Sequence, residues 1–502
     1  MGYGKWITAA VVLTGAFFVV GAWGDYLIAE ETIGDVTYTL TSPTEHGVLI
    51  PEPVGGANYM NSGFSHRSHI VTGVPDPHSG VYRIHVLYNT YYKHYGNNYY
   101  VYRDSGGANW STPVSLSDYF SGRCKIGSIA ADFEGHVYIA ASDFTGVNFE
   151  NIGDYEVFEV LGDASFGEPE VALPAAYGNY WSDAGGANLV VSRNGQHLVV
   201  IGQSSFYPDV FDFSSWAARK PDAGVPGWGD PVILSTFESR DRSMDHHAYG
   251  AVQDDGTFYV WTYPGYMYTY PPFYPFNNGI GLHYSQQDCD IGEFGGFGTW
   301  YGNGVYDFRI EDDMDYANTY FYSAITFYPD SNGYIHFGRF YNYPGESSAG
   351  LFNMSPAGEL STLYAPGEFG VDSDHPQMAL WESLGGAEEF IVVCYSKAEP
   401  AQPKLKWPAR LRIFKWNGGA DYQEIFGEDD IYLDFNEDLY EEDRHKQIYC
   451  NIATSKNESD NTFDIHVLWT SQNYRVNEDG DHIVIESDVY CREFTLTYEE
   501  VR

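Results

Sequence analysis

Histidine and arginine side chains gather at one recurring position in this chain, at or just ahead of short apolar stretches. Of the 16 histidines, six stand there: His66, His69, His246, His247, His375 and His445. Four arginines share the position in a chain that is short of basic residues: Arg67, Arg123, Arg242 and Arg444. An imidazole takes up or releases a proton near neutral pH, and a guanidinium offsets the charge of a carboxylate. Together these residue types suit proton transfer beside an anionic group.

The reaction that would use this set is β-elimination from a uronate. A cationic group must offset the uronate carboxylate before the C5 proton becomes acidic enough to remove. A neutral histidine or tyrosine then takes that proton, and a second such group protonates the leaving oxygen. The candidates for these proton transfers are His247, Tyr249 and His69. The candidates for binding the anionic ligand are Arg67, Arg242, His66, His246, Arg123, His375, Arg444 and His445.

Each of these residues also has a purely structural interpretation. Polar side chains ahead of a strand commonly satisfy the backbone groups of a turn. Polar groups that line an internal channel commonly bond to one another and to trapped water. For any single residue both interpretations stay open, and it is the gathering of six histidines that favours a functional site.

The shared position is set by a repeat. Pairs of apolar stretches recur along the chain, each pair joined by a polar turn, and the turns are anchored at Gly80, Gly135, Gly195, Gly256, Gly333, Gly386 and Asn461. A hairpin that recurs every ~40–50 residues or more indicates a radial array of sheets, because one such sheet cannot bury its own faces. The sequence therefore predicts an all-β fold without helices after residue 24. The expected architecture is a seven-bladed β-propeller of four-stranded antiparallel blades, forming one domain over residues 25–502.

In such a ring the residues ahead of each innermost strand converge on one face, although they are far apart in the sequence. We call this the leading face; it would carry the ten histidines and arginines named above. Closure of the ring is also predicted. Residues 35–41 alternate as a strand and are expected to pair with residues 493–498, which leaves no open edge.

Two segments resemble known propeller families. The turn Arg103–Trp110 resembles the Asp-box, or BNR repeat, of sialidase-type propellers, although its acid precedes the serine and Asn109 stands where threonine is usual. The segment DHHAYGAVQDDGTFYVW from Asp245 is similar to a repeat opening of ulvan lyases and related polysaccharide lyases. The resemblance implies a propeller with histidine, tyrosine and arginine at its active face, and it carries over to His247 alone.

A sialidase is the weaker interpretation of the same resemblance. Sialidases hold the substrate carboxylate with three arginines, and Arg67, Arg123 and Arg242 could supply them. The Arg-Ile-Pro opening of that family is absent, however, and no tyrosine–glutamate nucleophile pair stands out.

The charge balance limits the partners. The chain has 26 Lys and Arg against 69 Asp and Glu, a formal net charge of −43. Such a surface repels nucleic acid and anionic membranes, which excludes both as expected partners. A carboxylate-rich surface suits hydration in high salt, and it equally suits an acidic exported protein with no special salt requirement.

The first residues resemble a secretory signal. Lys5 precedes the apolar run from Trp6 to Val20, and Ala22-Trp23-Gly24 offers a cleavage site, so residues 1–24 are expected to be a signal peptide. An uncleaved membrane anchor is the alternative, for which the run is short. The mature protein is then expected to be secreted, at the cell surface or periplasmic, with no membrane association after cleavage.

Five cysteines are few for an exported chain of this length, and no spacing indicates haem or structural zinc. Cys450 and Cys491 fall in one predicted blade and could form a disulfide. No cofactor is expected, and no metal is assigned to the candidate site. A structural calcium ion at Asp434-x-Asn436-x-Asp438 competes with a plain solvated acidic face, since the glycine expected next is missing.

Taken together, these features predict an exported propeller that acts on an anionic polysaccharide, uronate or sulfated, with β-elimination as the enzymatic version. The rival hypothesis is a non-catalytic extracellular module that binds a glycan or a protein through the same face.

Overall fold

The fold is seen in a computed structural model of the chain. The described residues are 25–54, 56, 59–62, 68–90, 97–119, 123–124, 127–144, 152–174, 188–206, 211–220, 227–229, 232–239, 248–254, 258–262, 280–285, 306–308, 325–343, 346–355, 360–362, 373–383, 386, 388–397, 406–419, 421–426, 431–434, 445–456, 461–476 and 482–501. Among them the sole helical segment is the short 3₁₀ turn Leu116–Asp118. The all-β prediction is confirmed.

Four of the sheets are four-stranded and antiparallel throughout, as predicted for a blade. The first holds β4 (Ile70–Thr72), β5 (Arg83–Asn89), β6 (Asn98–Asp104) and β7 (Val114–Ser115). The third holds β13 (Asn188–Val191), β14 (Leu198–Phe206), β15 (Phe211–Lys220) and β16 (Val232–Ser239). The fourth holds β17 (Ala248–Val252), β18 (Phe258–Thr262), β19 (Ile280–Ser285) and β20 (Tyr306–Phe308). The fifth holds β21 (Ile325–Pro329), β22 (Ile335–Tyr343), β23 (Glu346–Met354) and β24 (Leu360–Thr362).

Three larger sheets depart from the uniform four-stranded form, which was a wrong prediction for them. The second holds β8 (Arg123–Cys124), β9 (Ser128–Ala131), β10 (Val137–Phe144), β11 (Ile152–Val160) and β12 (Glu170–Leu173). The sixth holds β25 (Ser373–Glu382), β26 (Glu389–Lys397), β28 (Ala409–Gly418), β29 (Asp421–Glu424) and β30 (Ile431–Tyr432). The seventh holds β31 (His445–Thr454), β32 (Thr462–Val476), β33 (His482–Glu500), β27 (Lys406–Trp407), β1 (Tyr26–Ile33), β2 (Val36–Ser42) and β3 (Val48–Leu49). The extra strands pair with backbone groups that a four-stranded sheet would leave open.

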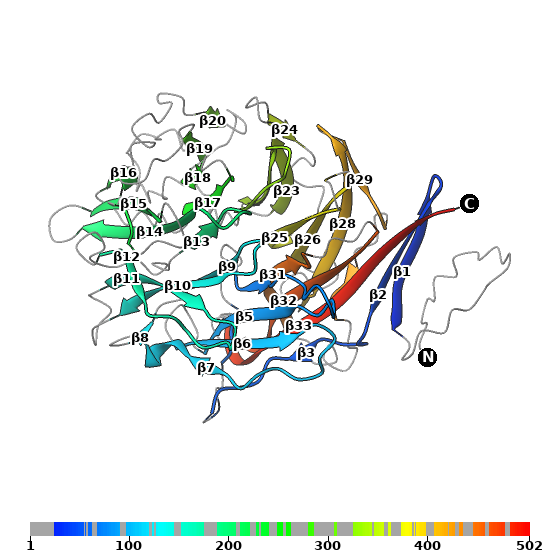
Figure 1. The fold of residues 1–502 in the computed structure, drawn as a ribbon, viewed down its shortest axis with the longest axis horizontal. Coiled ribbons are helices and arrows are strands. Elements are labelled where there is room, and N and C mark those ends of the chain that lie inside the picture. The colour runs from blue at the N-terminus through cyan, green and yellow to red at the C-terminus, as the bar shows by residue number, and fades with distance from the viewer. Residues whose placement is uncertain are drawn as a thin grey trace.

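The sheets are arranged radially, as in a propeller. The innermost strands contact one another in the order β4, β9, β13, β17, β21, β25, β31, and β31 in turn contacts β4. Figure 1 shows β9, β13, β17, β25 and β31 near the centre, with β16, β20, β24 and β29 toward the outside. The propeller arrangement predicted from the repeat is therefore confirmed.

The chain ends meet in the seventh sheet, as the sequence predicts. Strand β2 pairs antiparallel with β33, with Leu40 opposite Leu496 and Thr39 opposite Thr497. Buried and less buried residues alternate along β2, with Tyr38 and Leu40 buried, because one face of the strand packs on the core. This pairing joins residues from the two ends of the chain and removes an open edge.

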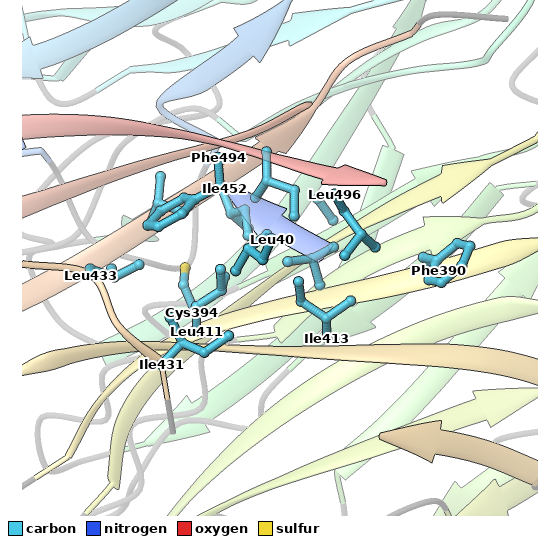
Figure 2. Close-up of a cluster of buried hydrophobic side chains, with 14 of the residues drawn as sticks. Leu40, Phe390, Cys394, Leu411, Ile413, Ile431, Leu433, Ile452, Phe494 and Leu496 are labelled. Atoms are coloured by element: carbon cyan, nitrogen blue, oxygen red, sulfur yellow. The ribbon is translucent and has the colours of Figure 1, made fainter. Parts of the chain in front are cut away.

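Apolar side chains fill the space between neighbouring sheets. In Figure 2, Cys394, Leu411 and Ile413 of the sixth sheet face Ile452, Phe494, Leu496 and Leu40 of the seventh. The rings of Trp381 and Phe463 stack in the same cluster, with their centroids 4.4 Å apart. Each such fully buried side chain contributes about 1.5–3 kcal/mol to folding. The ring of sheets is thus held by packing between faces that no sheet could bury alone.

The disulfide considered for Cys450 and Cys491 is not formed, and both thiols are free and buried. The two cysteines do share a sheet, but Cys450 lies in β31 and Cys491 in β33, with β32 between them. A disulfide needs Cα atoms about 4.4–6.8 Å apart, which suits neighbouring strands.

The turn that resembles an Asp-box joins β6 to β7. Gly106 adopts a left-handed conformation with φ 69°, and the Ser105 hydroxyl accepts the Tyr82 backbone N–H at 3.1 Å. Trp110 packs on an apolar core cluster, and the Arg103 guanidinium lies over its ring at 4.9 Å. The turn therefore fixes the edge strand to the rest of its sheet.

Among the described residues, no helix is both long and apolar enough to cross a membrane. The predicted signal peptide, residues 1–24, lies outside the described part of the chain.

Candidate functional site

The innermost strands begin where the sequence predicts. Strand β4 begins directly after His69, β17 directly after His247, and β31 at His445. These strands belong to the contacting ring described above. The positions of the candidate residues along the chain therefore match the start of the innermost strands.

Most candidate side chains fall outside what the structure describes. His66, Arg67, Arg242, His246, His247 and Arg444 lie outside the described residues. Tyr249, His375, His445 and Arg123 lie in β17, β25, β31 and β8, where the backbone alone is described. Convergence of these side chains on the leading face stays a prediction.

His69 is the one candidate whose side chain is described. It is buried, with 1% of its surface exposed. Its backbone N–H donates to Asn451 Oδ1 at 3.1 Å, and its carbonyl accepts the Leu87 N–H at 2.9 Å. The first and seventh sheets are thus linked at His69, below the surface of the leading face.

The middle of β31 contains a strained backbone residue. Strand β31 has a bulge between Ile448 and Asn451, and Tyr449 within it adopts φ 56°. A non-glycine residue in the left-handed region costs free energy, and such strain and such bulges concentrate beside functional sites. The Ser62 hydroxyl donates to the Tyr449 carbonyl at 2.7 Å and so supports the bulge. The bulge and the left-handed conformation of Tyr449 are features that functional sites often have.

The opposite ends of the innermost strands form a second region, which we call the turn face. It consists of the hairpin turns that leave these strands, around Asp132, Ser192, Asp330 and Ser383. Asp132 Oδ1 accepts backbone N–H groups of Glu134, Gly135 and His136 at 2.8–2.9 Å. Asp330 Oδ1 accepts those of Asn332 and Tyr334, both at 2.8 Å. Side-chain capping of the turn explains the polar residue three positions before Gly135, Gly195, Gly333 and Gly386.

Neighbouring turns are bonded to one another across the turn face. The Asn194 N–H donates to Asp254 Oδ1 at 2.8 Å, and Gln253 Nε2 donates to the Gly333 carbonyl at 3.2 Å. The Ser331 N–H donates to Glu382 Oε1 at 2.8 Å. These bonds link the third, fourth, fifth and sixth sheets in sequence.

Two cations complete this network. Arg193 forms an ion pair with Glu382, whose side chain is 6% exposed. Lys456 Nζ donates to the carbonyls of Ala131 (2.9 Å) and Asp132 (2.5 Å). Both cations lie over the Phe133 ring, Arg193 at 4.3 Å and Lys456 at 5.2 Å from its centroid. Burial lowers the pKa of Lys456 to about 7, against the opposing charge of Asp132. Arg193 and Lys456 are thus both engaged by partners within the turn face.

A cluster that sequence reasoning missed lies where the fifth and sixth sheets meet on the turn face. His336 Nε2 lies 3.2 Å from Asp330 Oδ2 and 3.8 Å from Glu389 Oε2, and all three side chains are buried. One ligand atom from each residue falls within 4.8 Å of the others, as in a metal site. Burial, and then the charge of Asp330, raise the pKa of Glu389 to about 8.

A signal for this region was present in the sequence. Five further histidines follow the turns at the start of the second strand of a repeat: His85, His136, His197, His336 and His466. Histidine therefore gathers at both ends of the innermost strands, and a count at one end alone overstates the case for a site there.

The calcium loop proposed at Asp434 is described only at its first residue. Asp434 is buried and accepts from the Gly47 N–H at 3.2 Å, and its Oδ1 lies 3.0 Å from His46 Nδ1. This carboxylate holds the N-terminal segment against the sixth and seventh sheets, while Asn436 and Asp438 lie outside the described residues.

Comparison with known proteins gives distant structural likenesses. No protein-family model matches this sequence, and no curated protein sequence matches it. An alpha-L-arabinanase of Penicillium chrysogenum is similar at 11% identity, over 89% of this chain and 97% of that one, with a TM-score of 0.39. An ulvan lyase of polysaccharide lyase family PL25 is similar at 10% identity, over 82% and 97%, with a TM-score of 0.39. The NanB sialidase of Streptococcus pneumoniae is similar at 12% identity, over 90% and 71%, with a TM-score of 0.39.

The resemblance to sialidases and ulvan lyases that the sequence indicates is therefore found among solved structures, at low identity. With TM-scores below 0.5, the likeness carries no argument about the fold or the activity. The fold rests on the described sheets and the site on its own residues.

Proposed function

We propose that this chain is an exported, seven-bladed propeller of the BNR or sialidase-like kind that cleaves an anionic polysaccharide by β-elimination on its leading face. The observation that supports it most is positional. The candidate histidines and arginines lie within a few residues of the start of innermost strands that contact one another in a ring. Groups at the start of adjoining strands are close enough to act on one ligand.

The chemistry assigns a role to each kind of group. Arg242 and Arg67 would neutralise a uronate carboxylate, which lowers the cost of forming negative charge at the neighbouring carbon. His247 would take the C5 proton as a neutral base, and Tyr249 would protonate the oxygen of the leaving sugar. The bond between C5 and hydrogen and the bond to the leaving oxygen break, and a C4–C5 double bond forms. No cofactor is needed for this sequence of steps.

The remaining candidates would bind further sugar units of the chain. His66, His246, Arg123, His375, Arg444 and His445 precede or begin strands in several sheets, so they could follow an extended anionic ligand. Because the chain has a net charge of −43, this proposed cationic patch would be the region that attracts an anionic ligand on an otherwise acidic surface. Export would bring the protein to such polysaccharides, with residues 1–24 removed as a signal peptide.

A non-catalytic module that binds glycan is the second candidate function. The observation in its favour is the burial of His69, one of the three residues assigned to proton transfer. A residue that is 1% exposed, and whose backbone bonds to Asn451 and Leu87, suits the linking of strands better than contact with a polysaccharide. A binding module would keep the cationic face without needing a base.

The experiment is a panel of uronate polysaccharides, sulfated and unsulfated, followed by ultraviolet absorbance. Elimination creates a conjugated, unsaturated product that absorbs, whereas hydrolysis and binding do not. We expect absorbance to rise with at least one uronate polysaccharide and with no neutral glycan. A flat signal over the whole panel, with retention of the protein on immobilised anionic glycan, would favour the binding module instead.

A further inference from the structure

We propose that Asp330, His336 and Glu389 bind a divalent transition-metal ion, with zinc as the best-fitting example, and that the ion joins the fifth and sixth sheets on the turn face. The site is separate from the leading face and does not depend on the proposed function. It rests on the arrangement of three buried side chains and on what holds each of them.

Each of the three residues presents one atom to a common point and uses its other atom elsewhere. Asp330 Oδ1 accepts the backbone N–H groups of Asn332 and Tyr334 in the turn, and Asp330 Oδ2 lies 3.2 Å from His336 Nε2. Glu389 Oε1 accepts Asn332 Nδ2 at 2.8 Å, and its Oε2 lies 3.8 Å from His336 Nε2. The hydrogen bonds to Asp330 Oδ1 and Glu389 Oε1 therefore fix the direction in which Asp330 Oδ2 and Glu389 Oε2 point.

The histidine is held in the same way from behind. His336 Nδ1 lies 2.6 Å from the Tyr422 hydroxyl, which also accepts Asn353 Nδ2 at 2.8 Å. The His336 ring packs edge-on against Trp416 at 4.9 Å. A metal-binding histidine typically has its second nitrogen bonded to an outer group that sets the ring orientation. Tyr422 has that position here.

One atom of the cluster is left available for a ligand. Glu389 is 3% exposed, and its Oε2 has no hydrogen-bond partner among the described residues. A buried carboxylate oxygen without a donor is costly, and a second carboxylate beside it adds repulsion. A dication at the common point would neutralise both carboxylates at once.

The spacing and the donor set suit zinc. Ligand atoms at about 2.0–2.2 Å from a tetrahedral zinc ion lie about 3.3–3.6 Å apart. The separations of 3.2 and 3.8 Å between His336 Nε2 and the two carboxylate oxygens lie on either side of that range, and all three atoms are within 4.8 Å of one another. Calcium prefers six to eight oxygen ligands, whereas one imidazole nitrogen with two carboxylates suits a transition metal.

The experiment uses the full chain, freed of metal with a chelator and titrated calorimetrically with zinc chloride. We expect saturable binding and a rise of at least about 2 °C in the unfolding temperature with zinc. Glu389→Gln keeps the shape of the side chain and should weaken zinc binding at least about 100-fold. Tyr422→Phe leaves all three ligands in place and should weaken it about 10–100-fold.

The control is His136→Gln in the second sheet. Asp132 and His136 form a similar turn pair at 2.8 Å, but the second sheet does not contribute to the proposed site. This variant should bind zinc as the wild type does. Equal binding by Glu389→Gln and wild type would overturn the proposal. A second result would also overturn it: the chelated wild type does not bind zinc, and Glu389→Gln has a higher unfolding temperature than the wild type. A proton shared by Asp330 and Glu389 would then offset the repulsion between the two carboxylates.

Discussion

The two ends of the innermost strands have the same kinds of residue but use them differently. On the turn face, Arg193 is paired with Glu382 and Lys456 is bonded to backbone carbonyls of the second sheet. Toward the leading face, Ser62 supports a strained bulge at Tyr449 in the middle of β31. One face uses its charges to join sheets, and the other contains the strained residue Tyr449 and is where the sequence predicts that cationic residues gather.

The difference shows how to separate a structural histidine from a functional one. His85, His336 and His466 on the turn face are buried, and each has a ring nitrogen within hydrogen-bond distance of a tyrosine hydroxyl. On the leading face, His69 is the one candidate histidine whose side chain is described, and the sequence analysis assigns the others to proton transfer or ligand binding. Substitutions at the turn face should therefore alter stability, and those at the leading face should alter activity.

The largest expected effect is the loss of activity on replacing His247. If His247 is the base, His247→Ala should lower the rate of unsaturated product formation by about 10²–10⁴-fold. The midpoint of unfolding should stay within error of the wild type. The measurement is initial rate by ultraviolet absorbance on the polysaccharide that gives a signal.

His78 provides a matched control, because it is an exposed histidine on the turn of the first sheet. His78→Ala should keep both rate and stability. Full activity of His247→Ala would show that His247 is not the base and would favour the binding module.

The next effect is the loss of a link across the turn face. Arg193→Met leaves the Glu382 carboxylate buried without its cation, which should lower the free energy of unfolding by about 3 kcal/mol. Denaturant unfolding followed by fluorescence would measure it. The exposed pair Arg83–Asp104, at 3.5 Å, is the comparison. Arg83→Met should cost less than about 1 kcal/mol. Equal losses from the two variants would contradict a structural role for the Arg193 pair.

The smallest expected effect is on the pH dependence of stability. Burial, and then the charge of Arg83, lower the pKa of His85 to about 3, whereas in the unfolded chain it is about 6.5. Between these values the unfolded state binds more protons, so stability falls as pH falls through that window. From pH 7 to pH 5 this residue should lower the free energy of unfolding by about 2 kcal/mol.

His85→Gln removes this titration. Denaturant unfolding at pH 7 and at pH 5 should show a smaller pH difference in the variant than in the wild type, by about that amount. An unchanged difference would mean that His85 is protonated in the folded protein.

Local sequence pattern was enough to predict the strands and the closure of the ring. The alternation in residues 35–41 sets which face of β2 is buried, and the polar residue before each glycine sets the turns. These features depend on neighbouring residues alone. The larger sheets could not be predicted in the same way, since two-residue strands such as β8 and β30 have no period of their own.

The candidate site could be predicted only as positions along the chain. Glu389 joins Asp330 and His336 because the sixth sheet packs against the fifth, and nothing in the sequence around Glu389 indicates that contact. In the same way, the order of β31, β32 and β33 separates Cys450 from Cys491, although both belong to one repeat. Packing between sheets, and not local pattern, decides these contacts.

The most direct test of the division between the two faces compares His247→Ala with Arg193→Met in one assay. Both are kept well below their unfolding midpoints, and the rate of unsaturated product formation is measured on the same uronate polysaccharide. We expect that His247→Ala loses the activity while folded and that Arg193→Met keeps it despite its lower stability. Retained activity in His247→Ala, or lost activity in folded Arg193→Met, would contradict it.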